Sequence, residues 1–97
     1  MQFLVNTFDN WEIDWNKQPE LLRLEAEHVW QQYRNGIVRN IWFTENRDAV
    51  LILECKDNEN AISIMNQFPL VLNNLVEFRI TNLLTYDGLE RLMYGTD

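Results

Sequence analysis

Five residues of this sequence could act together in acid–base chemistry on a small molecule. Glu25 and His28 stand three residues apart, so on a helix they would lie on neighbouring turns and could share a hydrogen bond. A carboxylate and an imidazole at that spacing make a workable proton-transfer couple, and His28 is the only histidine of the chain. Arg39 could hold a substrate carboxylate through two hydrogen bonds, while Tyr33 and Trp42 could wall a flat ring.

Each of these residues also has a purely structural interpretation. By the rotation of about 100° per helical residue, Glu25 lies about 70° and His28 about 130° from the centre of the apolar stripe. Glu25 could therefore be a solvated helix glutamate, and His28 a surface or interface histidine. Arg39 could form an internal ion pair with Glu54 or Glu77, and the two aromatic residues could simply pack in the core.

The elements that must position these residues follow from hydrophobic periodicity. Runs rich in β-branched and aromatic residues predict four strands, at 2–8, 37–44, 49–55 and within 75–84. Apolar residues at helical spacing predict two helices, over 20–34 and from an Asp57 cap to Phe68, where Pro69 ends the second helix. The order βαββαβ predicts an α+β, ferredoxin-like fold: a four-stranded antiparallel sheet with both helices on one face.

The pattern also predicts which side chains face the interior. The apolar stripe of the first helix comprises Leu22, Ala26, Val29, Trp30 and Tyr33. The inward face of the second helix comprises Ala61, Ile62, Ile64, Met65 and Phe68. Strict alternation in the second strand sets Ile37, Arg39, Ile41 and Phe43 on one side, against Val38, Asn40, Trp42 and Thr44. Because both faces of the sheet are half apolar and helices cover only one, we expect a second copy of the chain to cover the other.

Length and charge narrow the classes of partner. A length of 97 residues predicts one domain over 1–97, with a variable loop at 9–19 and a C-terminal tail at 85–97. The chain has 8 Lys and Arg against 15 Asp and Glu, a formal net charge of −7. Such a surface repels phosphate backbones and anionic lipid, so we expect neither nucleic acid nor membrane as a partner.

Residue counts argue against several cofactors. One cysteine and one histidine cannot build a conventional zinc site, and the three glycines lack the spacing of a phosphate-binding loop. No apolar run approaches the roughly 18 residues that span a bilayer, and the sequence shows no secretory signal. We therefore expect a cytoplasmic protein that uses no metal or other cofactor.

Two stretches of the sequence resemble the muconolactone isomerase-like family. The first runs from Glu25 to Trp42 and contains Gly36, then Arg39, then the aromatic Trp42. The second is Phe68-Pro69-Leu70-Val71, followed by the acidic strand over 75–80. The resemblance covers residues 1–8 and 20–88, and the family pattern has glutamate and arginine at the positions of Glu25 and Arg39 but tyrosine at that of His28.

This resemblance implies a fold, an activity and a set of site residues. The fold is the dimeric α+β barrel, in which two ferredoxin-like subunits pack their sheets together. The activity is that of a cofactor-free isomerase or cyclase that moves a proton next to a carbonyl. Taken together with the spacing of the residues, the resemblance predicts that Glu25 and His28 are catalytic and that Arg39, Trp42 and Tyr33 bind a small organic acid, lactone or phenolic ligand. The alternative is a non-catalytic homodimeric module that binds a small ligand or a partner with the same residues.

Overall fold

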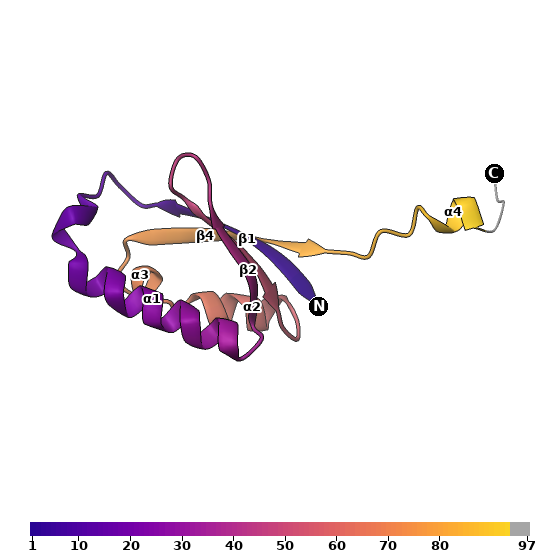
Figure 1. The fold of residues 1–97 in the computed structure, drawn as a ribbon, viewed down its shortest axis with the longest axis horizontal. Helices are drawn as coiled ribbons and strands as arrows, with labels where there is room; N and C mark the ends of the chain where they lie inside the picture. Colours follow the sequence, from indigo (N-terminus) through magenta and orange to yellow (C-terminus); the bar gives the residue numbers. More distant parts are fainter. Residues whose placement is uncertain (94–97) are drawn as a thin grey trace.

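The computed structural model describes residues 1–93, of which residues 2–83 form a four-stranded antiparallel sheet with helices on one face (Figure 1). The strands lie in the spatial order β2-β3-β1-β4 and comprise β1 (Gln2–Asp9), β2 (Val38–Phe43), β3 (Ala49–Glu54) and β4 (Val76–Leu83). The helices are α1 (Pro19–Arg34), α2 (Asn58–Met65), α3 (Pro69–Leu72) and α4 (Glu90–Met93), with a 3₁₀ turn η1 (Trp15–Lys17) before α1. The predicted ferredoxin-like α+β fold is confirmed.

Local signals explain where the main helices begin and end. Pro19 opens α1, where its missing N–H leaves no helical hydrogen bond unmade, and Gly36 follows the helix with a φ of +78° that suits glycine. The Asp57 carboxylate accepts a hydrogen bond from the Asn60 N–H at 2.8 Å and caps α2 as predicted.

Two predicted boundaries were wrong. The second helix ends at Met65 rather than at Phe68, and Pro69 begins the separate short helix α3. Proline fits this position because the first turn of a helix needs no N–H donor. In the stretch predicted as a plain loop, β1 extends through Asp9 and η1 follows, opened by the Asp14 carboxylate, which accepts a hydrogen bond from the Asn16 N–H.

The packed core lies between α2 and one end of the sheet. Its fully buried members are Phe3, Val5, Val38, Leu51, Leu53, Ala61, Met65 and Phe68. Of the predicted inward face of the second helix, Ala61, Met65 and Phe68 are buried and Ile64 packs partly against them. Ile62 is 38% exposed instead, because the helix contacts the core through Ala61 and Met65, one turn apart, and Ile62 lies about 80° round from the middle of that contact.

Strict alternation along β2 was also wrong, because the strand contains a β-bulge between Val38 and Asn40. Val38 pairs with Leu53 and Ile41 pairs with Leu51, so three steps on β2 match two on β3. Val38 is therefore buried on the helix side of the sheet, the side that Ile41 also faces.

Of the apolar stripe of α1, Val29 packs partly against the core, but most of the stripe does not. No residue of α1 is buried, and Trp30 and Tyr33 are 58% and 53% exposed. The helix contacts the rest of the protein through the neighbouring face, which carries Glu25 and His28. The stripe faces an open space between α1 and the sheet, and that space is the candidate site.

Beyond β4 the chain leaves the body of the protein. Residues 84–93, here called the arm, run outward from the sheet and end in α4 (Figure 1). The arm forms part of the predicted C-terminal tail at 85–97, whose residues 94–97 lie outside the described residues.

Candidate functional site

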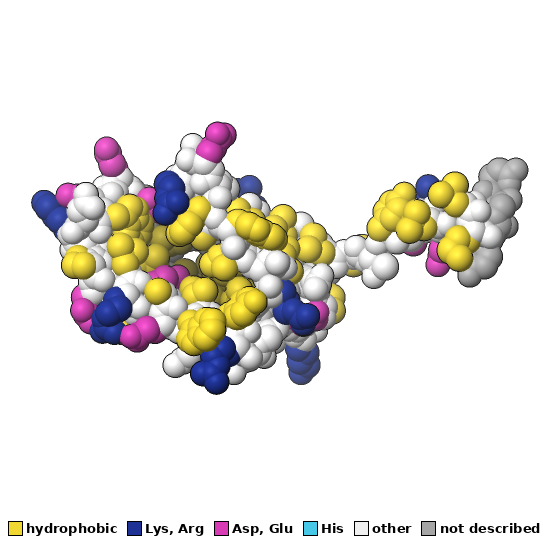
Figure 2. Space-filling model, viewed as in Figure 1, with side chains coloured by type: hydrophobic (Ala, Val, Ile, Leu, Met, Phe, Trp, Pro, Cys, Tyr) yellow, Lys and Arg dark blue, Asp and Glu magenta, His cyan; other side chains and the backbone are white. Residues whose placement is uncertain are grey.

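A cavity of about 1160 Å³ lies between α1 and the sheet and is open on one side (Figure 2). Its floor is formed by Thr7, Ala49 and Leu51, and its helix wall by Leu22, Ala26 and Val29. The inner end is formed by Met65, Phe68, Leu70 and Val71, where the cavity meets the packed core. Its lining is mostly apolar with a few polar groups, as is usual for a small-molecule site.

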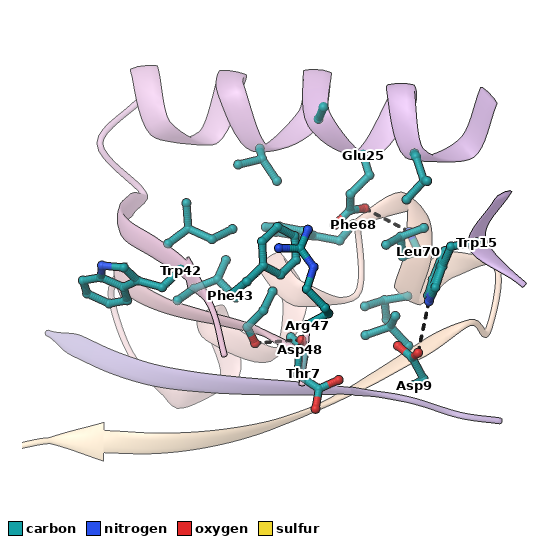
Figure 3. A pocket seen from close by; sticks show the side chains of 18 of the residues that line it. Thr7, Asp9, Trp15, Glu25, Trp42, Phe43, Arg47, Asp48, Phe68 and Leu70 are labelled. Atoms are coloured by element: carbon teal, nitrogen blue, oxygen red, sulfur yellow. Dashed lines mark hydrogen bonds between the residues drawn. The ribbon is translucent and has the colours of Figure 1, made fainter. Parts of the chain in front are cut away.

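Glu25 is the acidic residue that α1 presents to this cavity (Figure 3). Its Oε1 accepts a hydrogen bond from the Leu70 N–H at 3.0 Å, in the first turn of α3, where backbone N–H groups lack helical partners. Burial raises the pKa of Glu25 above its ordinary value, although the Leu70 hydrogen bond opposes this effect. The carboxyl is therefore held in place and is more basic than a solvated glutamate.

His28 does not line the cavity. Its ring lies edge-on against Phe68, with ring centroids 4.7 Å apart, and its Nε2 is buried without a hydrogen-bond partner among residues 1–93. Burial lowers the pKa of His28, so the imidazole is favoured in its neutral form. Phe68 does line the cavity, so His28 lies behind the cavity wall and no hydrogen bond joins it to Glu25 within the described chain.

Arg39 is also absent from the cavity lining and is exposed to solvent on β2. It lies at the opposite end of the sheet, where its charge helps to lower the pKa of Glu54. The main cause of that lowered pKa is the hydrogen bond from the amino group of Met1, whose nitrogen lies 2.6 Å from Glu54 Oε2. The structure therefore does not bring Arg39 and Glu25 together.

The cation at the cavity is Arg47, in the turn between β2 and β3. The Arg47 Cζ lies 4.2 Å from the ring centroid of Phe43, and the side chain reaches into the space beneath α1 (Figure 3). The turn is closed by a hydrogen bond of 2.8 Å from the Thr44 N–H to the Asp48 carbonyl, with Arg47 at a φ of +67°. Sequence reasoning missed Arg47, because a charged turn residue carries no periodic signal.

The predicted aromatic walls lie at the mouth of the cavity. Trp30 and Tyr33 are stacked, with ring centroids 6.1 Å apart and planes 15° from parallel, and both line the cavity. Trp42 also borders the cavity and is 53% exposed, but it pairs with Val50 and its indole points away from Glu25 and Arg47 (Figure 3). Three of the five predicted site residues, Glu25, Tyr33 and Trp42, are thus brought to one cavity.

Two further polar groups close one end of the cavity. The Trp15 Nε1–H donates to Asp9 Oδ2 at 3.1 Å and fixes the indole of η1 against the end of β1 (Figure 3). The Thr7 hydroxyl donates to the Ala49 carbonyl at 2.7 Å and is thereby occupied. Asp9 and Trp15 lie in the stretch whose irregular sequence predicted only a loop.

Neither a metal site nor a membrane span was found in the part of the chain described. Residues 1–93 contain no cluster of three or more His, Cys, Asp or Glu side chains that could bind a metal ion. None of the helices within the same range is long and apolar enough to cross a membrane.

Comparison with known proteins identifies the fold. No family model and no curated protein sequence matches this chain. Among solved structures, muconolactone isomerase matches with a TM-score of 0.75 and 19% identity, over 90% of this chain and 92% of that chain. The chain has a muconolactone isomerase-like fold.

A second solved structure supports the same fold. The 5-chloro-2-hydroxyhydroquinone dehydrochlorinase of Burkholderia phenoliruptrix, in complex with 2,5-dihydroxybenzoquinone, matches with a TM-score of 0.66 and 13% identity. The match covers 91% of this chain and 98% of that chain. Both of these solved structures with this fold are thus enzymes that act on small molecules.

Proposed function

We propose that the cavity binds a small carbonyl compound and that Glu25 moves a proton next to its carbonyl, as in a cofactor-free isomerase or cyclase. The observation that carries this proposal is the Glu25 carboxyl itself, held by the Leu70 N–H at a mostly apolar cavity with a raised pKa. A base is most effective when its pKa approaches the working pH, so burial brings Glu25 closer to that condition.

The chemistry needs few parts. The Glu25 carboxylate takes a proton from the carbon next to the carbonyl. The electron pair of that C–H bond forms a carbon–carbon double bond, and the π pair of the carbonyl moves onto its oxygen to give an enolate. The Glu25 carboxylic acid then returns the proton to another carbon of the same conjugated system. The carboxylate is regenerated, and the substrate is isomerised without loss or gain of atoms.

The ligand we propose is a flat lactone, phenol or small organic acid. Tyr33 offers a ring face at the mouth, Trp42 borders the cavity from β2, and Arg47 offers a cation to an anionic group or to the enolate oxygen. The two similar enzymes are named for a lactone and a hydroxyhydroquinone, which are compounds of this kind. Arg39 stays a candidate anchor only if a second chain brings it to a cavity.

We also propose that this single domain forms a cytoplasmic homodimer through the outer face of the sheet. Leu4, Val50 and Ile52 lie on that face, since Leu4 pairs with Ile52 and alternates with the buried Phe3 and Val5. No helix covers them within residues 1–93 (Figure 1). A second sheet packed there would remove this apolar surface from water.

Proton exchange into deuterated water tests the proposed chemistry. Butenolide lactones and hydroxyquinones are incubated with the protein in D₂O, and proton NMR follows the signal next to the carbonyl. We expect the wild type to exchange this proton. The exchange rate of Glu25→Gln should be lower by a factor of about 10²–10⁴, the usual contribution of a general base. Equal rates for the two proteins would refute the role of Glu25.

Matched arginine variants locate the ligand in the same experiment. Arg47→Ala removes the cation at the cavity, and Arg39→Ala removes one outside it. We expect thermal stabilisation by anionic ligands to fall in Arg47→Ala and to persist in Arg39→Ala. The reverse result would restore the sequence-based role of Arg39.

The non-catalytic binding module is the second candidate, and one observation favours it. The predicted couple of Glu25 and His28 is not joined by a hydrogen bond, since His28 lies behind Phe68. Ligands that stabilise the wild type and Glu25→Gln equally, with no proton exchange in either, would support this module over the enzyme.

A further inference from the structure

The arm carries large apolar side chains that are exposed to water. Leu84, Leu92 and Met93 are 82%, 81% and 76% exposed, and Tyr86 and Leu89 are 75% and 59% exposed. Single exposed leucines are common on protein surfaces, but such a density within residues 84–93 is typical of a segment that packs against a partner.

The arm nevertheless has a definite local shape. The Tyr86 ring folds over Gly88 so closely that any side chain at position 88 would overlap it. The Glu90 N–H donates to the Asp87 carbonyl at 3.1 Å, and the Met93 N–H donates to the Leu89 carbonyl at 3.2 Å. Leu89 and Met93 are one helical turn apart, so the arm presents a short apolar face.

The arm and the cavity lie at opposite ends of the sheet. Val76 pairs with Asp9 at the cavity end of β4, and Leu83 pairs with Gln2 at the other end. Seven residue steps of strand separate these ends by about 23 Å. Because the arm starts at the far end and runs away from the sheet (Figure 1), it does not cover the cavity of its own chain.

The open side of the cavity has a matching apolar border. Trp30, Tyr33, Trp42 and Phe43 line the cavity and are between 53% and 61% exposed. Figure 2 shows hydrophobic side chains gathered around the hollow between α1 and the sheet, and others on the arm. Neither of these two surfaces has a cover within residues 1–93 of one chain.

We propose that the arm of one copy packs across the open side of the cavity of a second copy and supplies the wall that residues 1–93 of one chain leave open. The occupant is a second copy because both apolar surfaces belong to the same chain, are present in equal number and do not meet within its described residues. The contact joins two different surfaces. Two copies can therefore exchange arms with each other, or several copies can form a ring in which each arm reaches the next cavity. The proposal rests on this geometry and not on proton transfer at Glu25.

Cross-linking between two chains tests the contact. In a Cys55→Ser background, a chain with Leu89→Cys is co-expressed with a differently tagged chain with Tyr33→Cys, and the mixture is mildly oxidised. We expect a disulfide-linked species that contains both tags. The matched control replaces Tyr33→Cys by Phe8→Cys, on the outer face of the sheet, and we expect no such species.

A second set of variants separates packing from chance collision. In the full chain with the same cysteines, Leu92→Asp and Met93→Asp together should abolish the cross-link and lower the mass measured by light scattering, whereas Glu90→Gln in the same turn should change neither. A cross-link to Phe8→Cys instead, or a wild type that is monomeric at every concentration, overturns the proposal. A cross-link without proton exchange in the wild type would leave it standing and refute the proposed catalysis alone.

Discussion

The two ends of the sheet differ in what covers them, although the same strands run through both. At one end Phe3 and Leu53 are fully buried and pack with α2 and Phe68. At the other end Thr7 and Ala49 form the floor of a cavity of about 1160 Å³, and α1 stands away from them.

The difference follows from side-chain size and polarity along a single strand face. On β1 the residues that face the helices are Phe3 and Val5, followed by Thr7 and Asp9. The large apolar pair draws α2 onto the sheet, whereas the polar pair cannot be buried against an apolar helix without loss of hydration. An amphipathic helix can therefore turn its apolar stripe towards a cavity instead of a core.

The largest effect should come from removing matched apolar groups at the two ends. We expect Leu53→Ala to lower the free energy of unfolding by about 2–5 kcal/mol, because the residue is fully buried and leaves a void. Ile41→Ala, which removes as many carbons at the cavity, should cost about 1 kcal/mol, because that side chain is already 38% exposed. Urea denaturation measures both, and equal losses would contradict the contrast between packed and open ends.

A smaller effect should come from His28, which belongs to the packed side of α1. Burial favours the neutral imidazole of His28 over the charged one and so lowers its pKa. The stability that depends on the neutral form is therefore present above the unfolded pKa and is lost as the pH falls through the folded pKa. We expect His28→Leu to lose less stability than the wild type between pH 7 and pH 5. At pH 7 the variant should gain on the order of 1 kcal/mol, because the unpaired buried Nε2 is removed.

Thermal unfolding across this pH range measures the His28 effect. The control is His28→Gln, which keeps a polar side chain but does not titrate and should also flatten the acid loss. A wild-type profile parallel to that of both variants would show that His28 is not the group responsible.

The smallest effect should come from Glu25, at the boundary between the two ends. Its raised pKa means that folding favours the protonated carboxyl of Glu25. The stability that depends on the protonated form is present at low pH and is lost as the pH rises through the folded pKa. Glu25→Gln keeps an acceptor for the Leu70 N–H and removes the charge. The melting temperature of the variant should therefore rise relative to that of the wild type at pH values above the ordinary pKa of a glutamate. This pH dependence has the opposite sign to that of His28. A melting-temperature advantage of Glu25→Gln that shrinks with rising pH would contradict the prediction.

Much of the fold could be predicted because its signals are local. Asp57 caps α2 through a neighbouring N–H, and Gly36 follows α1 in a conformation that suits glycine. The β2 bulge could not be predicted, since it depends on how Val38 meets Leu53 on another strand. Alternation is a property of one strand, whereas register is a property of two.

The candidate site was predictable only in part, for a related reason. Helical periodicity placed Glu25 beside the apolar stripe, and the structure brings it to the cavity together with Tyr33 and Trp42. The same periodicity could not show that Arg39 lies at the far end of the sheet, or that a turn brings Arg47 beneath α1.

The sequence by itself determined the order of strands and helices, the acidic surface and the residue types available for proton chemistry. Only the tertiary structure decided that α1 turns Glu25 towards a cavity and His28 towards Phe68, and that the arm extends away from the sheet. The physical reason is the range of the interactions. Backbone geometry and capping act over a few residues, whereas the rotation of a helix and its distance from a sheet depend on the summed packing of side chains far apart in the chain.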